Sequence, residues 1–523
     1  MLIEDQTPTL NFLKDPKTHG KPASDIATVE THISFVVLVG CRAFKLKRAV
    51  RLPYVDFSTA SKRLLFCQRE LELNRRTAPA LYLAVRRITR EANGCLAFDG
   101  RGPLVDAVVE MARFDEETLF DRMAARGALT QSLLTETART IARFHADAAI
   151  DHSRKGSANM AWVIATNKQA LAQTSLFASR SSAASATFRT LLARNAALLE
   201  ARERTGKVRR CHGDLHLRNI CLVDGAPTLF DCIEFDETLA TIDILYDLAF
   251  LIMDLWHRGL RSSANLVMNR YLDERDETDG LPVLPFFMAV RALVRAHVIA
   301  TQSEQVQASV HDQLSLEAQT YFDLSMQLPV PVPARLIVIG GLSGTGKSTL
   351  AAAIAEHLGP PPGARVLSSD RIRKKLWGVP AETHLEQEAY SPEASERVYS
   401  HLFGEARTIL GHGHSVIADA VFDRAADREK IEKCAMDAGV PFKALWLEAP
   451  MNLLFERVAT RKGDPSDATI EIVRTQAARQ LGTIDWRRVP VGDDLDDVVA
   501  RVTTILDVGI AIPSHTAKPD EAD

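Results

Sequence analysis

The segment that most constrains this chain is 341–348, with the sequence GLSGTGKS, which has the spacing GxxxxGK[ST]. It follows an apolar, β-branched run at 335–340 and precedes an alanine- and leucine-rich stretch. Glycines let backbone N–H groups curve around a phosphate, and the start of the next helix adds unpaired N–H groups and a positive dipole end. The segment therefore predicts a strand, a phosphate-binding loop and a helix, as in a parallel α/β domain.

The surrounding pattern extends this α/β prediction. Predicted strands alternate with helical stretches, which is typical of a parallel sheet covered on both faces, at 335–340, 364–368, 414–418 and 442–447. The segment 328–334 holds three prolines and cannot continue a helix, so we expect a linker there. The sequence predicts an α/β P-loop domain over 335–510, followed by a polar, disordered tail over 511–523.

The loop residues are predicted to bind a nucleotide together with magnesium. The expected nucleotide-binding set comprises Gly341, Ser343, Gly344, Thr345, Gly346, Lys347, Ser348 and Thr349. Lys347 supplies a positive charge to the β- and γ-phosphates, and the Ser348 hydroxyl is a ligand for Mg²⁺. Asp419 ends the apolar run 415–419 and is expected to order water on Mg²⁺, although a helix-capping aspartate fits the same position.

Two further groups are expected to carry the transfer chemistry of this domain. Asp370 follows a predicted strand, where it can accept the proton of an acceptor hydroxyl, and Arg373 can hold an anionic group. Arg457 and Arg461 are spaced i,i+4, which predicts one helix face, and the turn-rich 462–469 follows them. We expect a lid whose arginines stabilise phosphate charge. A helix cap and solvated charged side chains remain the alternatives.

The first part of the chain carries a different motif, HGDLHLRN at 212–219, with Asp231 twelve residues after Asn219. A phosphoryl-transfer site without a glycine-rich loop needs a carboxylate near the acceptor hydroxyl and two oxygen ligands for Mg²⁺. Asp214 suits the base, and Asn219 and Asp231 suit the metal. A soft-metal site at His212 and His216 lacks a third ligand at a suitable spacing, so we expect His212 to brace the loop.

The elements around this motif are expected to form two lobes. Strands are predicted at 33–48 (a hairpin turning at residues 40 and 41), 105–114 and 229–235, and helices at about 58–76, 130–205 and 240–325. This order predicts a small strand-rich lobe over about 28–115 and a helical lobe over about 116–327.

These motifs resemble two known families. HGDLHLRN with the following FD is similar to the aminoglycoside-phosphotransferase branch of the protein-kinase-like fold. That resemblance implies a bilobal α+β domain over 1–327, with 108–114 as the hinge strand. It also implies an ATP lysine paired with a helix acid; Lys45 is preferred to Lys47 on the same strand face, and Glu70 to Glu72. GGLSGTGKST, SSDRIR, VIADAVF and RVATRKGDPSDAT resemble P-loop kinases related to polynucleotide kinase and zeta toxin, of the AAA family ATPase type.

Together the resemblances imply a bifunctional enzyme that uses ATP and Mg²⁺ to phosphorylate hydroxyls of small molecules. They identify neither acceptor. One alternative is a single P-loop kinase that acts on a nucleotide or a nucleic-acid end, with a regulatory first domain. The other is a non-enzymatic ATP-driven switch.

Composition narrows the partners and the compartment. The formal net charge is -4, and RIRKK at 371–375 is the compact basic cluster near a site, without stacking aromatics, so nucleic acid is an unlikely partner. The 7 cysteines form no CxxC pair, which favours reduced thiols. The N-terminus shows no signal-peptide pattern, and the apolar run 244–256 is short and contains two aspartates. We expect a cytoplasmic protein without a membrane partner; the sequence specifies no oligomeric state.

Overall fold

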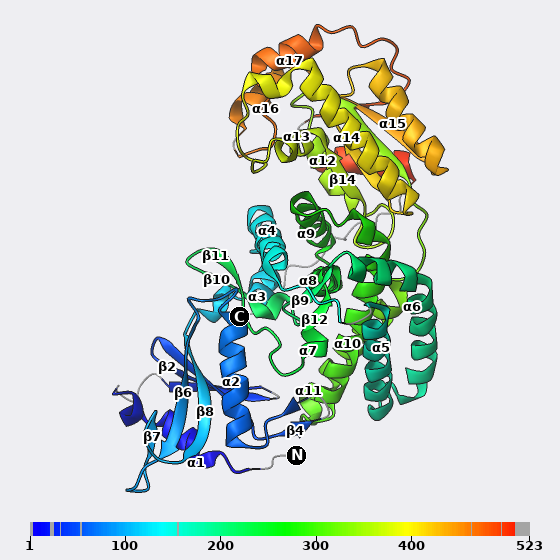
Figure 1. The fold of residues 1–523 in the computed structure, drawn as a ribbon. Coiled ribbons are helices and arrows are strands. Elements are labelled where there is room, and N and C mark those ends of the chain that lie inside the picture. Colours follow the sequence, from blue (N-terminus) through cyan, green and yellow to red (C-terminus); the bar gives the residue numbers. More distant parts are fainter. Residues whose placement is uncertain are drawn as a thin grey trace, which may run out of the picture. The chain divides into compact units, whose positions relative to one another are not determined.

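The computed structural model describes residues 4–20, 26–31, 33–52, 55–153, 156–461, 463–492 and 494–507. The tail predicted over 511–523 lies outside these described residues. The chain forms two compact units (Figure 1). Unit 1 comprises Met1–Gly259 and Phe286–Gln327, and unit 2 comprises Leu260–Pro285 and Leu328–Asp523.

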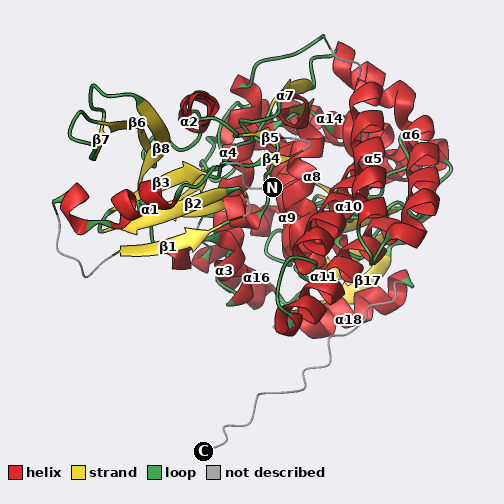
Figure 2. Ribbon diagram, turned by 90° about the horizontal axis from the view of Figure 1, so that it is seen from below, coloured by secondary structure: helices red, strands yellow, loops and turns green. Residues whose placement is uncertain are grey.

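Unit 1 begins with an antiparallel sheet in the order β1-β2-β3-β8-β6-β7 (Figure 2). The strands are β1 (Ile26–Glu30), β2 (Ser34–Val39), β3 (Arg42–Lys47), β6 (Tyr82–Arg90), β7 (Leu96–Phe98) and β8 (Leu104–Ala112). The predicted hairpin and the predicted strand near 105–114 are confirmed. The hairpin turns at Gly40, whose φ of 56° lies in the left-handed region that glycine adopts without a Cβ clash.

Both faces of this sheet are covered, and the alternation of β3 decides which side chain faces which cover. Phe44 and Leu46 join the apolar cluster of α1 (Thr7–Lys14), whereas Ala43 joins the cluster of α2 (Ala60–Asn74). The period of two therefore places Lys45 and Lys47 on the α2 side of the sheet. The predicted helix over 58–76 is confirmed by α2.

The rest of unit 1 is mostly helical. Its longer helices are α4 (Gln131–Asp147), α5 (Gly156–Gln173), α6 (Ser181–Arg204), α8 (Ile244–His257), α10 (Leu284–Ser303) and α11 (Ala308–Gln327). Its short elements are α3 (Phe120–Ala125), α7 (Glu237–Ala240), β4 (Arg51–Leu52), β5 (Val55–Asp56), β9 (Val208–Arg210), β10 (Ile220–Val223), β11 (Ala226–Leu229) and β12 (Thr241–Asp243). As predicted, the apolar run 244–256 is a buried helix, α8.

Within the described ranges, one helical stretch, Thr278–Ser303, is long and apolar enough to cross a membrane, with a mean hydropathy of 1.7 over its most apolar window. Of that window, 78% is buried, which is typical of a core helix.

The strand predicted over 229–235 is wrong. β11 ends at Leu229, and Asp231 turns the chain with a φ of 64°. The next two backbone N–H groups then leave the ladder: that of Cys232 donates to the side chain of Asn74, and that of Ile233 donates to the carbonyl of His212. The alternation in LFDCIEF reflects side chains that face different neighbours around a turn.

Unit 2 holds a parallel sheet in the order β14-β15-β13-β16-β17. The strands are β13 (Leu336–Gly341), β14 (Arg365–Ser368), β15 (Val416–Asp419), β16 (Phe442–Glu448) and β17 (Arg487–Pro490). The helices are α9 (Arg261–Glu274), α12 (Lys347–Ala355), α13 (Ser369–Leu376), α14 (Pro392–Gly411), α15 (Ala425–Ala438), α16 (Met451–Thr460), α17 (Ile470–Ala477) and α18 (Leu495–Leu506). Four predicted strands are confirmed, and the sequence missed β17.

These units confirm the predicted fold class: an α+β unit of two lobes and an α/β unit with a parallel sheet. In unit 2 the core lies between β13, α12 and α18, where Ile337, Ile339, Leu350 and Val502 are buried together. This core fixes the end of β13 against the start of α12, and the loop 341–348 joins them.

Candidate active sites

In unit 1, a buried glutamate of α2 joins two lysines of β3. Glu70 is fully buried, and its two carboxylate oxygens lie 2.7 Å from Lys45 Nζ and 2.6 Å from Lys47 Nζ. Burial acts to raise the pKa of Glu70, but the two lysines more than offset this effect and lower the pKa to about 2. Lys45 also lies 2.5 Å from Asp231 Oδ1, and Lys47 pairs with the buried Glu234. The structure thus brings Lys45, Glu70 and Asp231 together. The Lys47–Glu234 pair is not among the contacts predicted from the sequence.

The loop 212–219 places Asp214 and Asn219 side by side. Asn219 Nδ2 donates to Asp214 Oδ2 at 2.9 Å, and the carbonyl of Asn219 accepts from the N–H of Phe230, the residue before Asp231. A continuous set of contacts therefore joins Asp214 to Asp231 and Lys45. The Asp214 side chain is 38% exposed. Burial acts to raise the pKa of this carboxyl, but His216 and His212 hold it well below its usual value, so it is a carboxylate at neutral pH.

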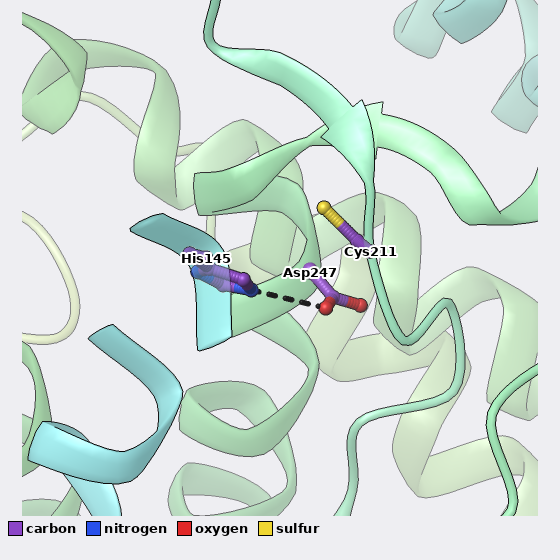
Figure 3. Close-up of side chains that lie close together, drawn as sticks. All are labelled: His145, Cys211 and Asp247. Atoms are coloured by element: carbon purple, nitrogen blue, oxygen red, sulfur yellow. Dashed lines mark hydrogen bonds and ion pairs between the residues drawn. The ribbon is translucent and has the colours of Figure 1, made fainter. Parts of the chain in front are cut away.

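A buried aspartate of α8 holds this loop in place. Asp247 accepts the backbone N–H groups of His212 at 3.0 Å and Gly213 at 2.9 Å, and its Oδ2 lies 3.2 Å from His145 Nε2 (Figure 3). His212 Nε2 lies 2.9 Å from the carbonyl oxygen of Phe230, so the predicted bracing role of His212 is confirmed. The backbone donors of His212 and Gly213 are thus satisfied by a buried charge.

The same aspartate belongs to a buried group with His145 and Cys211 whose potential ligand atoms lie within 4.8 Å of one another (Figure 3). Burial raises the pKa of the Cys211 thiol well above its usual value, and the thiol donates to the carbonyl of Ile242. Because the Asp247 carboxylate accepts two backbone N–H groups of the loop 212–219, this group braces the loop.

In unit 2, the glycine-rich loop has the backbone that its sequence requires. Gly341, Gly344 and Gly346 have φ values of 138°, 90° and 86°, and a Cβ on Gly341 would come within 2.7 Å of the Leu447 carbonyl oxygen. α12 begins at Lys347, directly after the loop. The backbone therefore curves as a phosphate cradle needs, and within it the N–H of Ser343 donates to the side-chain oxygen of Gln476 at 2.9 Å.

Charged and hydroxyl groups meet at the mouth of this loop. Lys347 Nζ donates to the Leu342 carbonyl at 3.0 Å, and the Ser348 hydroxyl donates to Asp419 Oδ2 at 2.5 Å. Burial raises the pKa of Asp419 to about 6 and that of Asp370 above its usual value, with Lys347 opposing both shifts. This set of one ammonium, one hydroxyl and two carboxylates fits a phosphate chain with Mg²⁺.

α13 presents Asp370 in its first turn and Arg373 one turn later. Arg373 is buried, donates to the Ala389 carbonyl and lies over the Tyr390 ring at 4.6 Å. Asp467, in the loop between α16 and α17, pairs with Lys374 of α13 and accepts from the Tyr390 hydroxyl. Asp467 is not among the site residues predicted from the sequence.

The predicted helix face shared by Arg457 and Arg461 is wrong. α16 ends at Thr460, and Arg461 has an extended backbone with a ψ of 135°, so the i,i+4 relation is broken. Arg457 donates to the Gly492 carbonyl at 2.5 Å, whereas Arg461 lies 3.6 Å from Asp464. Of the two arginines, Arg461 contributes to the charge around Lys347.

Comparison with known proteins identifies two domains in the chain. Residues 56–281 match the model of the Phosphotransferase enzyme family, and residues 336–482 match the model of an AAA domain. An adenylyl-sulfate kinase of Myxococcus xanthus is 33% identical over 122 residues, which are 23% of this chain and 62% of that protein. The protein is therefore an enzyme of the kinase class, with two domains of kinase families in one chain.

A relative matches both domains at once. An uncharacterized protein of Mycobacterium tuberculosis strain H37Rv is 31% identical over 467 residues, which are 87% of this chain and 90% of the relative. The chain belongs to the family of this mycobacterial protein.

Solved structures similar to parts of the chain include two small-molecule kinases. A choline kinase from Cryptosporidium parvum Iowa II has a TM-score of 0.37 and 11% identity, and covers 58% of this chain and 88% of its own. A gluconokinase from Sinorhizobium meliloti 1021 has a TM-score of 0.24 and 22% identity, and covers 34% of this chain and 96% of its own.

Proposed function

We propose that the protein is a bifunctional phosphotransferase that moves the γ-phosphoryl group of ATP to hydroxyls of small molecules at two sites. The observation that carries this proposal is that each unit holds its own complete set of groups. Unit 1 has Lys45, Asp214 and the pair Asn219 and Asp231, and unit 2 has the glycine-rich loop with Lys347 and Asp419. A regulatory domain has no need for an acceptor-side carboxylate beside a metal-ligand set.

In the first site, the residues present fit MgATP. Lys45, held by Glu70, binds the phosphates of ATP, and the oxygens of Asn219 and Asp231 suit Mg²⁺, which offsets the phosphate charge when bound. Asp214 orients the acceptor hydroxyl and takes its proton as the bond to phosphorus forms. The low pKa of Asp214 keeps it ready as an acceptor at neutral pH.

In the second site, the loop N–H groups and Lys347 bind the β- and γ-phosphates, while Ser348 and Asp419 suit Mg²⁺ and its water. Asp370 is the base for the second acceptor, and Arg373 and Arg461 stabilise the charge of anionic oxygens there. Catalysis at both sites comes from positioning and charge stabilisation rather than from covalent chemistry.

Two variants of the full chain test this proposal. Asp214→Asn and Lys347→Met are each incubated with γ-³²P-labelled ATP, Mg²⁺ and a metabolite extract. We expect each variant to lose a different labelled product, and the double variant to lose both. If Asp214→Asn changes no product, the enzyme is a single P-loop kinase with a regulatory first domain. Label that appears only as free phosphate would instead support an ATP-driven switch.

We also infer a cytoplasmic location with ATP and small-molecule acceptors as partners. All cysteines are free thiols, and five of them are buried, which suits a reducing compartment. The basic cluster 371–375 is engaged inside the protein, since Arg373 and Lys374 are buried and Arg371 pairs with Asp273. This arrangement supports the expectation that nucleic acid is not a partner.

A further inference from the structure

The second site is braced by a helix that belongs, by sequence, to the first kinase family. α9 lies within residues 56–281, which match the phosphotransferase model, yet it packs in unit 2. There it lies along β14, which is the edge strand of the parallel sheet. An edge strand presents unpaired N–H and C=O groups that must be satisfied or covered.

Two buried asparagines of α9 satisfy this edge. Asn269 Oδ1 accepts the backbone N–H of Val366 at 2.8 Å, and its Nδ2 donates to the Ala364 carbonyl at 3.2 Å. Asn265, one turn earlier, donates to the carbonyls of Ala364 at 3.0 Å and Pro362 at 3.1 Å. Asn265 is 3% exposed and Asn269 is 1% exposed, so their side chains replace the hydrogen bonds that another strand would make.

One turn further along α9, Asp273 holds both sides of the junction between β14 and α13. Its carboxylate lies 2.8 Å from Arg365 Nη1 at the start of β14 and 3.3 Å from Arg371 Nη1 in α13. Arg270 of α9 contributes a third pair at 2.8 Å. The Arg365 side chain is 4% exposed, so this is a largely desolvated ion-pair network.

The junction held by Asp273 carries the acceptor-side groups. α13 is 8 residues long and begins at Ser369, so Asp370 precedes Arg371 and Arg373 follows it by two residues. A short helix has little stability of its own, and its orientation depends on tertiary contacts. We propose that Asn269 and Asp273 are positioning residues of the second phosphotransfer site, which act through β14 and α13. This inference rests on the proposed function of that site.

The helices before and after α9 in the chain contact the loop 212–219 of the first site. α9 is preceded by α8, which supplies Asp247 to the loop 212–219, and is followed by α10, whose Arg291 donates to the Gly213 carbonyl at 3.0 Å. A single run of chain, 244–303, therefore anchors the catalytic loop of the first site near both of its ends and α13 of the second site in its middle. Unit 2 therefore includes a helix from the stretch of chain that matches the first family.

The test uses the full chain with its first site silenced by Asp214→Asn, so that ATP turnover reports the second site. Phosphate release from γ-labelled ATP is measured with water as the acceptor. Asp273→Asn and Arg371→Met are each expected to lower kcat by about tenfold to a hundredfold while the KM for ATP changes less than about twofold, because the displaced groups lie on the acceptor side. Asp273→Glu keeps the charge and should recover part of the rate. Glu274→Gln, at an exposed position of α9, is the matched control.

Hydrogen exchange supplies a readout that does not depend on turnover. In Asp273→Asn, amides of 366–376 should exchange at least about tenfold faster, while those of β13 and β15 keep their wild-type rates. Unchanged exchange together with unchanged kcat in Asp273→Asn and Arg371→Met would overturn the inference. Turnover that survives Lys347→Met would overturn the proposed function instead, so the two failures are distinguishable.

Discussion

Lys47 offers the sharpest test of the electrostatics of the first site. Its side chain is 1% exposed and lies between Glu70 and Glu234, which are 0% and 5% exposed. Lys47→Met keeps an unbranched chain of similar length and removes the charge. Glu70 retains Lys45, so Glu234 becomes the unpaired buried carboxylate.

The expected loss of unfolding free energy in Lys47→Met depends on whether the unpaired Glu234 takes up a proton. Removing one partner of a buried pair costs about 3–5 kcal/mol. A buried carboxylate without a partner can become neutral by taking up a proton. The loss of unfolding free energy then cannot exceed the free energy needed to protonate it. From the ordinary carboxyl pKa this is about 4 kcal/mol at pH 7 and about 1 kcal/mol at pH 5. Because the folded pKa of Glu234 in the variant lies above its unfolded value, the loss is largest at high pH and shrinks as the pH falls.

Urea unfolding followed by circular dichroism at pH 7 and pH 5 measures this difference. The double variant Lys47→Met with Glu234→Gln removes the unpaired charge and should regain most of the free energy of unfolding at pH 7. Lys45→Met is the contrasting variant: its side chain is 14% exposed, and we expect it to abolish the first labelled product with a smaller effect on stability. The reasoning is refuted if Lys47→Met unfolds like the wild type at pH 7, or if its loss is the same at both pH values.

Two further predictions address one unit each. Burial lowers the pKa of His414 in unit 2 to about 4, although its hydrogen bond to the Gly363 carbonyl at 3.0 Å opposes the shift. In the unfolded chain His414 takes up a proton below about pH 6.5, whereas in the folded chain it stays neutral down to about pH 4. As the pH falls from 7 to 5, His414 should therefore lower the free energy of unfolding by about 2 kcal/mol. Urea midpoints of His414→Gln should show a correspondingly smaller pH dependence, and an identical dependence would contradict the assignment. In unit 1, Asp247→Asn places an amide against the N–H groups of His212 and Gly213, so it should cost about 2–4 kcal/mol and at least about tenfold in the first labelled product. The second labelled product, measured in the same samples, should be unchanged; a parallel loss of both products would mean that the variant is simply unfolded.

Local sequence determined the parts of both sites that a short run of backbone builds. The spacing of glycines at 341, 344 and 346 specifies the φ values of the loop, and Lys347 and Ser348 follow at the start of its helix. The run 212–219 likewise brings Asp214 and Asn219 within one turn of chain. Apolar, β-branched runs identified most of the sheet around each site, because strand burial leaves a direct pattern in the residues.

Only the tertiary structure decided the partners that come from distant parts of the chain. Glu234 and Lys47 are hydrogen-bonded although they lie 187 positions apart in the sequence, and Val366 and Asn269 are hydrogen-bonded although they lie 97 positions apart. Asp231 was predicted inside a strand, yet it turns the chain, because Asn74 and His212 accept the N–H groups that follow it. Such pairings depend on which surfaces pack together. The packing energy is a sum over many residues, and a short sequence pattern does not identify them. The composition of α9 predicts a helix, but its contact with β14 depends on the tertiary structure, because its asparagines bond to the edge of that strand.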